Sequence, residues 1–240
     1  MTNNTTVKGI KINAFYSKND FLDYIKNENK ILIAINAEKI LKKDTKLKNI
    51  INENIGYPDG VGAVMALKQK GLNAVKIPGS EFWLDIIKRF EKEKSFYLIG
   101  TTQEVINNTV IKLKTEYPNI NILGYQNGFL NDSQKIELKE KLQELKPDVV
   151  FVAQGTPRQE LLMDELIKVH PALYMGLGGS FDIYGGNKKR APKIFLDLHL
   201  EWLYRLLKEP TRIGRQINLV KFLKKFNFIK TWKIIKKQYI

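Results

Sequence analysis

Short apolar segments alternate with longer helical patterns along most of this 240-residue chain. Five segments rich in β-branched and aromatic residues carry little polar alternation, which is typical of parallel strands buried on both faces; they are residues 31–36, 95–100, 119–125, 148–155 and 172–178. Helical patterns lie between them, at residues 60–71, 80–94, 102–116, 132–146 and 157–169. This order predicts an α/β fold, with a Rossmann-like, mostly parallel sheet flanked by helices.

The positive charge of the chain is concentrated near its C-terminus. The whole chain has 40 basic and 25 acidic residues, a formal net charge of +15. Residues 188–240 hold 15 Lys or Arg and three acids, a net charge of +12, whereas residues 1–187 hold 25 and 22, a net charge of +3. An excess of this size indicates an anionic partner, such as nucleic acid, an acidic membrane or a phosphorylated substrate.

The sequence pattern changes at residue 193. Residues 193–208 predict one helix that stops near Pro210, and residues 217–229 predict an amphipathic helix with Leu and Phe opposite Lys. Such a helix can lie in a membrane interface, or it can dock on its own domain or on another subunit. We therefore divide the chain into an α/β catalytic domain, residues 1–192, and a basic, membrane-associating helical appendage, residues 193–240.

Missing and scarce residue types exclude several kinds of site. The chain has no cysteine and only two histidines, His170 and His199, which excludes disulfides, thiolate metal sites, a cysteine nucleophile and a multi-histidine metal centre. The N-terminus lacks the apolar core of a signal peptide, and no stretch is apolar enough to span a bilayer. We expect a cytoplasmic protein whose basic tail can hold it on the inner face of the membrane.

Ligands of parallel sheets bind beyond the carboxyl ends of the strands, so the loops there are the places to search for a site. In the first such loop, residues 54–71, Asp59 stands at a strand-to-helix junction. A carboxylate at this position can act as a general base, or it can cap the helix. Gly60 beside it permits a tight backbone and close approach of a ligand.

The second loop, in residues 151–165, ends a buried strand and starts a helix. Thr156 as N-cap and Pro157 at the first helical position form, with Gln159, a capping-box-like pattern. The helix N-terminus beside Arg158 is also suited to an anion. We expect the polar groups of this loop to contact a ligand: Gln154, Gly155, Arg158 and Gln159.

The third segment, residues 175–193, is a glycine cluster followed by a basic loop that includes Arg190. Gly178 and Gly179 lead to Asp182 in a pattern that resembles a phosphate-binding turn, although it is not GxGxxG and lacks the Walker lysine. The fourth segment, residues 200–216, contains three arginines: Arg205, Arg212 and Arg215. These side chains could bind a diphosphate, or they could lie on a solvent-exposed helix face.

Smaller polar clusters lie at other strand-to-helix turns. They occur at the end of the first predicted strand and in residues 78–81, 100–102 and 126–128. Each cluster also fits ordinary turn or cap chemistry. From these turns we take five candidate substrate-binding residues: Asn36, Gly79, Ser80, Gln126 and Asn127.

Together, these segments resemble the WecG/TagA/CpsF family of bacterial glycosyltransferases. The resemblance runs from residue 7 to residue 216 and rests on YPDGVGAV, GTPRQE, GLGGSFD with the following KKRAP, and LEWLYRLLKEPTR, in the family's order. It implies inverting transfer of an N-acetylhexosamine-type sugar, N-acetylmannosamine or a related one, from a UDP-sugar to a GlcNAc unit on polyprenyl diphosphate. It implies no essential metal and no other cofactor, and products such as teichoic acid linkage units, enterobacterial common antigen or capsule-type polymers.

The resemblance also implies roles for particular residues. Asp59 matches the family's proposed base, and Gln159 matches a glutamine of the substrate pocket. The lipid diphosphate would be held by basic residues of the tail and the loop before it: Arg190, Arg205, Arg212 and Arg215. This chain departs from the family's pattern at two positions: Ala34 stands where the family often has Thr, and Glu81 where it often has Asp. These departures bear on which sugar is transferred more than on the class of reaction. The implied partners are the donor, the lipid-linked acceptor, an anionic membrane and further copies of the chain.

Two other classes of function fit part of the sequence. The basic segment with Trp202 and Trp232 could bind nucleic acid, but no nucleic-acid-binding signature is present, and Asp59 and the glycine loops would have no role. A nicotinamide-dependent enzyme would carry a glycine fingerprint near the N-terminus, which the chain lacks. We therefore favour the glycosyltransferase and expect no nucleic-acid partner.

Overall fold

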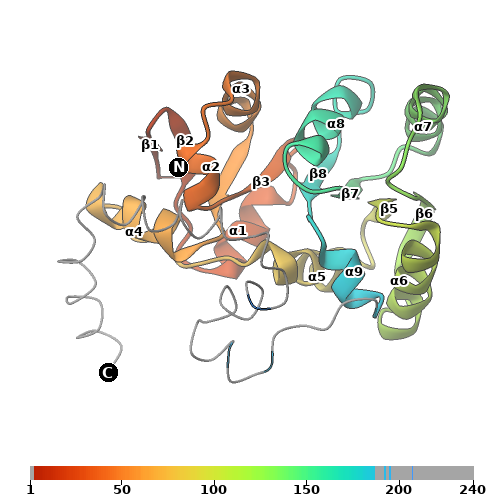
Figure 1. Cartoon of the computed structure of the whole chain (residues 1–240). Coiled ribbons are helices and arrows are strands. Elements are labelled where there is room, and N and C mark those ends of the chain that lie inside the picture. The colour runs from red at the N-terminus through yellow and green to blue at the C-terminus, as the bar shows by residue number, and fades with distance from the viewer. Residues whose placement is uncertain (1–2, 187–191, 193–194, 196–206, 208–240) are drawn as a thin grey trace.

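A computed structural model describes residues 3–186 together with residues 192, 195 and 207 (Figure 1). Its main sheet has six strands in the order β4-β3-β8-β7-β5-β6, and every neighbouring pair is parallel. The strands are β3 (Ile31–Ile35), β4 (Ile55–Pro58), β5 (Ser95–Gly100), β6 (Asn121–Gln126), β7 (Val149–Ala153) and β8 (Leu173–Gly176). The predicted α/β fold with a parallel sheet is confirmed.

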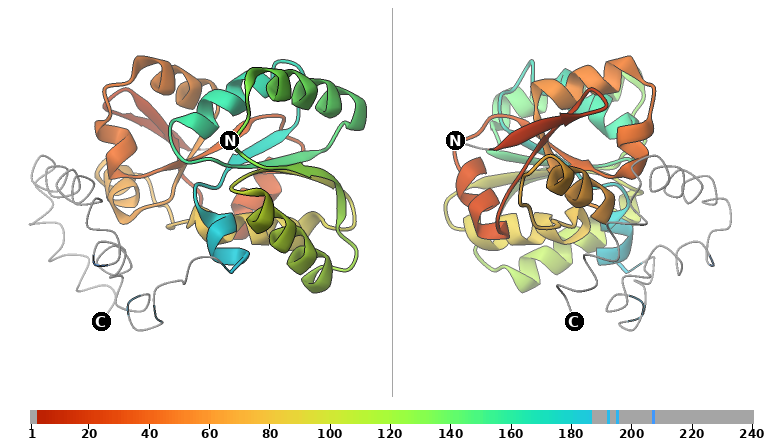
Figure 2. Two further views of the ribbon diagram at one scale, coloured as in Figure 1. Left: turned by 45° about the vertical axis from the view of Figure 1, so that its right-hand side comes forward. Right: turned by 90° about the vertical axis from the view of Figure 1, so that its left-hand side faces the viewer.

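Helices cover both faces of this sheet (Figures 1 and 2). The apolar residues of α2, α3, α4, α7 and α8 pack into one buried cluster and those of α1, α5, α6 and α9 into another. Strand residues alternate between the two clusters. In β3, for example, Ile31 and Ile33 belong to the first cluster and Leu32 belongs to the second. Both faces of a strand are therefore apolar, which is why the strands read as continuous apolar segments in the sequence.

The five predicted helices are present with boundaries close to those expected: α4 (Val61–Gln69), α5 (Gly79–Phe90), α6 (Gln103–Glu116), α7 (Asp132–Leu145) and α8 (Arg158–Leu166). Seven further elements were not among the ten predicted segments. One is the strand β4, which the sequence indicated only as the strand-to-helix junction at Asp59. The others are the hairpin strands β1 (Asn4–Val7) and β2 (Ile10–Asn13), and the helices α1 (Lys18–Ile25), α2 (Ala37–Leu41), α3 (Thr45–Glu53) and α9 (Ser180–Tyr184). Most of them are too short for a periodic apolar pattern to repeat, whereas α3, with nine residues, is as long as the predicted helices α4 and α8.

Several predictions fall on residues that the structure does not describe. They concern most of the two helices expected within 193–229, the chain that follows the domain boundary at residue 192, and four arginines: Arg190, Arg205, Arg212 and Arg215. Within the described part of the chain, none of the helices is both long and apolar enough to cross a bilayer.

Candidate active site

A cleft of about 330 Å³ opens at the carboxyl ends of four adjacent strands, β8, β7, β5 and β6. Six of its lining residues were predicted from the sequence: Gln154, Gly155, Arg158, Gly178, Gly179 and Asp182. The others come from the ends of β5, β6 and β7: Thr101, Thr102, Gly128, Phe129 and Ala153. The fold therefore brings the second and third candidate loops together into one cavity.

Hydrogen bonds between side chains and backbone hold the walls of this cleft. The Thr101 hydroxyl donates to Asp182 Oδ1 at 2.5 Å, which joins the end of β5 to α9. Gln154 Nε2 donates to the Gly128 carbonyl at 2.6 Å, and the Gly128 amide donates to the Thr101 carbonyl at 2.9 Å. Three strand ends are thus linked directly, so the lining is preorganised.

Arg158 is the cationic side chain among the residues that line the cleft. It is the first residue of α8 and is exposed, and it makes no ion pair within the described part of the chain. The N-terminus of α8 carries the positive end of the helix dipole at the same place. Arginine and helix amides together suit a phosphate or diphosphate group.

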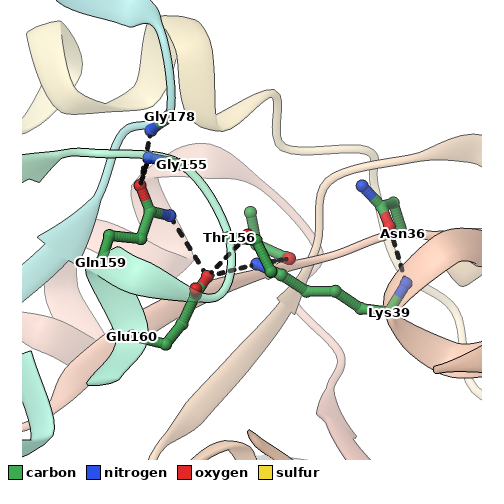
Figure 3. A network of polar contacts seen from close by, with 8 residues as sticks. Asn36, Lys39, Gly155, Thr156, Gln159, Glu160 and Gly178 are labelled. Carbon is green, nitrogen blue, oxygen red and sulfur yellow. Dashed lines mark hydrogen bonds and ion pairs between the residues drawn. The ribbon is translucent and has the colours of Figure 1, made fainter. Parts of the chain in front are cut away.

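A buried polar network lies behind the cleft, between α2 and α8 (Figure 3). Lys39 Nζ lies 2.8 Å from Glu160 Oε1, and their side chains are only 7% and 1% exposed. The same glutamate oxygen accepts hydrogen bonds from the Thr156 hydroxyl at 3.0 Å and from Gln159 Nε2 at 3.2 Å. Lys39 Nζ also donates to the Ala34 carbonyl at 3.0 Å. The network therefore joins the end of β3 to the start of α8.

Neither Lys39 nor Glu160 was among the residues predicted from the sequence. A lysine in a helix and a glutamate in a GTPRQE segment look like solvated residues until the fold places them together in the core. Burial raises the pKa of Glu160, but the ion pair with Lys39 and the hydrogen bonds outweigh it and hold the pKa below its usual range. Glu160 is thus ionised at neutral pH.

Gln159 connects this network to the glycine loops. Its side-chain oxygen accepts from the Gly155 amide at 3.2 Å and from the Gly178 amide at 2.8 Å. The residue is 4% exposed and stands behind the cleft rather than among its lining residues. Gln159 therefore fixes the two loops that bound the cleft, and its direct contact with a substrate stays a prediction.

The predicted capping box at the start of α8 is wrong. The N-cap position is Pro157, with no side-chain capping bond, and the helix begins at Arg158. The Thr156 hydroxyl donates instead to Glu160. A hydrogen bond to an ionised carboxylate is stronger than one between neutral groups, so the hydroxyl turns toward Glu160.

Asp59 follows β4 and belongs to a second group of candidate residues. Its Oδ1 accepts a hydrogen bond of 2.7 Å from the amide of Gly79, the first residue of α5. The helix that follows Asp59 in sequence, α4, has Gly60 as its N-cap and no side-chain capping bond. The alternative interpretation of Asp59 as a cap is thus wrong for α4, and the carboxylate stands at the positive end of α5 instead.

Tyr57 lies near this carboxylate, since the Tyr57 hydroxyl and Asp59 Oδ1 both approach Gly79. A Cβ atom added to Gly79 would come within 2.6 Å of the Tyr57 hydroxyl, so α5 can start this close only with glycine. Tyr57 is fully buried, and its hydroxyl has no hydrogen-bond partner among the described residues. Burial raises its pKa well above the ordinary value, and the nearby carboxylates of Asp59 and Glu160 raise it further.

The remaining candidates occupy the same edge of the sheet. Asn36 caps α2 by accepting from the Lys39 amide, and a Cβ atom on Gly60 would lie 3.4 Å from Asn36 Cβ. Ser80 is exposed in the first turn of α5. Two residues support the loop after β6: Gln126 ends the strand, and Asn127 accepts from the Phe129 amide. None of these four lines the cleft.

Strand order relates the two groups of residues. Asp59 follows β4, and Gly178 follows β8, with β3 between them. Neighbouring strands lie about 4.8 Å apart, so the two strand ends are separated by about 10 Å along one edge. The Asp59 carboxylate and the cleft that contains Arg158 therefore lie at the same edge of the sheet, at a distance that a sugar diphosphate can bridge.

The sequence pattern that defines the glycosyl transferase WecG/TagA/CpsF family matches residues 5–237. This chain belongs to that family. The family expected from the motifs is therefore confirmed, and with it the general role of a glycosyltransferase. The match also includes residues 217–237, where the sequence motifs had ended. In the described residues of this glycosyltransferase, no three His, Asp or Glu side chains are grouped to hold a metal ion.

Proposed function

We propose that this protein is an inverting glycosyltransferase that moves an N-acetylhexosamine from a UDP-sugar to a GlcNAc unit on polyprenyl diphosphate. N-acetylmannosamine or a related sugar is the expected donor sugar. The observation that carries the proposal is the shared edge of the sheet, where Asp59 lies about two strand spacings from the cleft that contains Arg158. A carboxylate and a cation thus lie along one edge of the sheet, which supports their proposed roles as base and anion site.

The proposed chemistry is a single displacement. The acceptor hydroxyl attacks C1 of the donor sugar, the bond from C1 to the UDP oxygen breaks with its electron pair, and the hydroxyl proton passes to Asp59. Attack from the face opposite UDP inverts the anomeric centre. Arg158 and the N-terminus of α8 compensate the negative charge that develops on departing UDP.

The cleft itself is nearly neutral, because its charged lining side chains are Arg158 and Asp182. A donor diphosphate and a lipid diphosphate need more positive charge than this. We propose that the basic segment supplies it, with four arginines around the lipid diphosphate at the inner face of the membrane: Arg190, Arg205, Arg212 and Arg215. Self-association of the chain and independence of metal ions are part of the same proposal.

A donor screen tests the proposed reaction. The full chain is incubated with single UDP-sugars and a short-chain GlcNAc diphospholipid, with and without a chelator, and the products are measured by mass spectrometry. The expected product is heavier than the acceptor by one N-acetylhexosamine residue and forms in the presence of the chelator. Absence of product with every UDP-sugar would contradict the proposed donor, and a requirement for added metal would contradict the metal-independent mechanism.

A further inference from the structure

We infer that the buried ion pair of Lys39 and Glu160 is a positioning pair, which fixes the place of Asp59 relative to the start of α8. Neither side chain lines the cleft, so the pair acts through the residues that it ties together. The inference rests on the proposed function, because it concerns the geometry between the proposed base and the proposed anion site. It gives a role to two buried groups that the proposed displacement does not use.

Glu160 attaches the pair to the start of α8, two residues after Arg158 (Figure 3). One carboxylate oxygen, Oε1, accepts from the Thr156 hydroxyl at 3.0 Å and from Gln159 Nε2 at 3.2 Å. Lys39 Nζ lies 2.8 Å from the same oxygen. The loop before α8 and the first turn of that helix therefore meet at a single atom, and the position of this atom affects where the helix N-terminus lies.

Lys39 attaches the pair to the end of β3. Its Nζ donates to the Ala34 carbonyl at 3.0 Å, and its backbone amide donates to Asn36 Oδ1 at 3.0 Å. The carbonyl between these two contacts, that of Ile35, accepts from the Asp59 amide at 3.1 Å. The backbone of the proposed base is thus bonded to the same strand end that the lysine holds.

The Asp59 carboxylate is fixed independently, by the Gly79 amide at 2.7 Å. Asp59 is therefore held by α5 through its side chain and by β3 through its backbone. The charge of Glu160 also reaches the end of β4. Burial raises the pKa of Tyr57, and the carboxylates of Asp59 and Glu160 raise it further. The contacts from α8 through β3 to Asp59 thus form one short and continuous path.

Stability alone does not account for this pair. The desolvation of two ionisable groups offsets most of their attraction, so an apolar pair of the same shape would stabilise the fold about as well. An ion pair with further hydrogen bonds differs from an apolar pair because its geometry is directional. Direction matters for group transfer, since a misplacement of about 1 Å between reacting groups can lower the rate about a hundredfold.

The test is the double variant Lys39→Met/Glu160→Gln of the full chain. It removes the contact with the Ala34 carbonyl, while the glutamine oxygen can still accept from Thr156 and Gln159. We expect kcat for transfer, measured with saturating donor and acceptor, to fall roughly ten- to a hundredfold. The dissociation constant of UDP, measured by titration calorimetry, should stay close to that of wild type, because the contacts of Gln159 with the glycine loops remain.

Two further variants complete the experiment. Asp164→Asn/Lys168→Met removes an ion pair of 2.8 Å on the same helix, α8, and is the matched control. It should keep the kcat of wild type. Lys39→Met/Glu160→Leu replaces the buried pair by apolar side chains, which are expected to restore stability, and its kcat should fall as well.

The outcomes separate this inference from the proposed function. If wild type transfers the sugar and either folded variant of the buried pair keeps its kcat, the positioning role is wrong while the proposed function stands. Weaker UDP binding with unchanged kcat would also overturn it, since the pair would then shape only the cleft. If wild type transfers no sugar from any UDP-sugar, both proposals fail. Thermal unfolding of each variant shows whether a loss of activity reflects a loss of folding.

Discussion

Glu160 is a carboxylate in the core with three hydrogen-bonding or ionic partners on one oxygen. Its other oxygen, Oε2, is buried and has no partner among the described residues. The desolvation of Lys39 and Glu160 offsets much of their attraction, so the pair contributes little net stability over an apolar pair of the same shape. Removal of one partner is different, because it leaves a single charge buried.

We expect Lys39→Met to lower the free energy of unfolding by about 3–5 kcal/mol, since it leaves Glu160 unpaired. The double variant Lys39→Met/Glu160→Leu should recover most of this loss. Urea denaturation measures both. Equal stability of Lys39→Met and wild type would mean that the ion pair does not form.

The pair also predicts a dependence of stability on pH. The pKa of Glu160 is lower in the folded state than its usual value of 4.5, so its contribution is fully present above that value and is lost as pH falls through the folded pKa. The double variant lacks this contribution. As the pH falls, wild type should therefore lose more stability than the double variant does. Urea denaturation of both proteins at pH 7 and below pH 4.5 measures this difference.

Tyr57 and Tyr174 are a matched pair of buried tyrosines. The Tyr57 hydroxyl has no partner among the described residues, whereas the Tyr174 hydroxyl donates to the His170 carbonyl at 2.9 Å. We expect Tyr57→Phe to leave the free energy of unfolding unchanged or to raise it, and Tyr174→Phe to lower it by about 1 kcal/mol. Urea denaturation compares the two. A clear loss of stability in Tyr57→Phe would show that its hydroxyl has a partner.

Asp59 has a structural contact and a proposed chemical role that two substitutions separate. In Asp59→Asn the side-chain oxygen can still accept from the Gly79 amide, so unfolding should be unchanged, while kcat for transfer should fall by about a hundredfold or more. Asp59→Ala should lose the activity and also about 1 kcal/mol of stability with the lost cap. UDP affinity is the control and should be similar in all three proteins. Near-normal transfer by Asp59→Asn would show that the base is another group.

At the scale of elements, the loop after β7 and the loop after β8 depend on one side chain. Gln159→Met would leave the amides of Gly155 and Gly178 without their acceptor. We expect a loss of about 2 kcal/mol in the free energy of unfolding and a weaker affinity for UDP, because both loops bound the cleft. Gln134→Met, at the capping box of α7, is the control and should leave UDP affinity unchanged. Unchanged UDP binding in Gln159→Met would show that loop position does not matter for the donor.

The elements that could be predicted are those with a long, uniform pattern. Strands buried on both faces appear as apolar segments, and the five predicted helices show the helical period of their apolar residues. Length alone does not decide this, because α3 has nine residues, as α4 and α8 do, and was not predicted. The helix α2 has five residues, so its sequence signal is reduced to the cap residue Asn36. Ser17 and Asp44 cap α1 and α3 in the same way, and this local signal could have located all three helices.

At the scale of the whole molecule, charge is divided between two parts of the chain. Residues 1–187 carry a net +3 and residues 188–240 a net +12. We expect Lys→Gln at Lys221, Lys224 and Lys225 to weaken binding of the full chain to anionic lipid vesicles roughly a hundredfold, at about 1 kcal/mol for each charge. Vesicle co-sedimentation measures the change.

The control for this prediction neutralises three exposed lysines of the described domain, Lys43, Lys46 and Lys70, which removes the same total charge. It should bind vesicles nearly as wild type does. If both triple variants lose binding equally, the membrane responds to the overall charge of the protein rather than to its C-terminal segment.

The sequence by itself determined the α/β class, the family and the loops that carry chemistry, because buried strands and short motifs are local patterns. Tertiary structure alone decided which loops share a cleft, since the strand order β4-β3-β8-β7-β5-β6 differs from the order along the chain. It also decided that Lys39 meets Glu160, that Asp59 caps α5, and that Phe129 stands at the cleft. These contacts join residues far apart in sequence, and no local pattern encodes such a pairing.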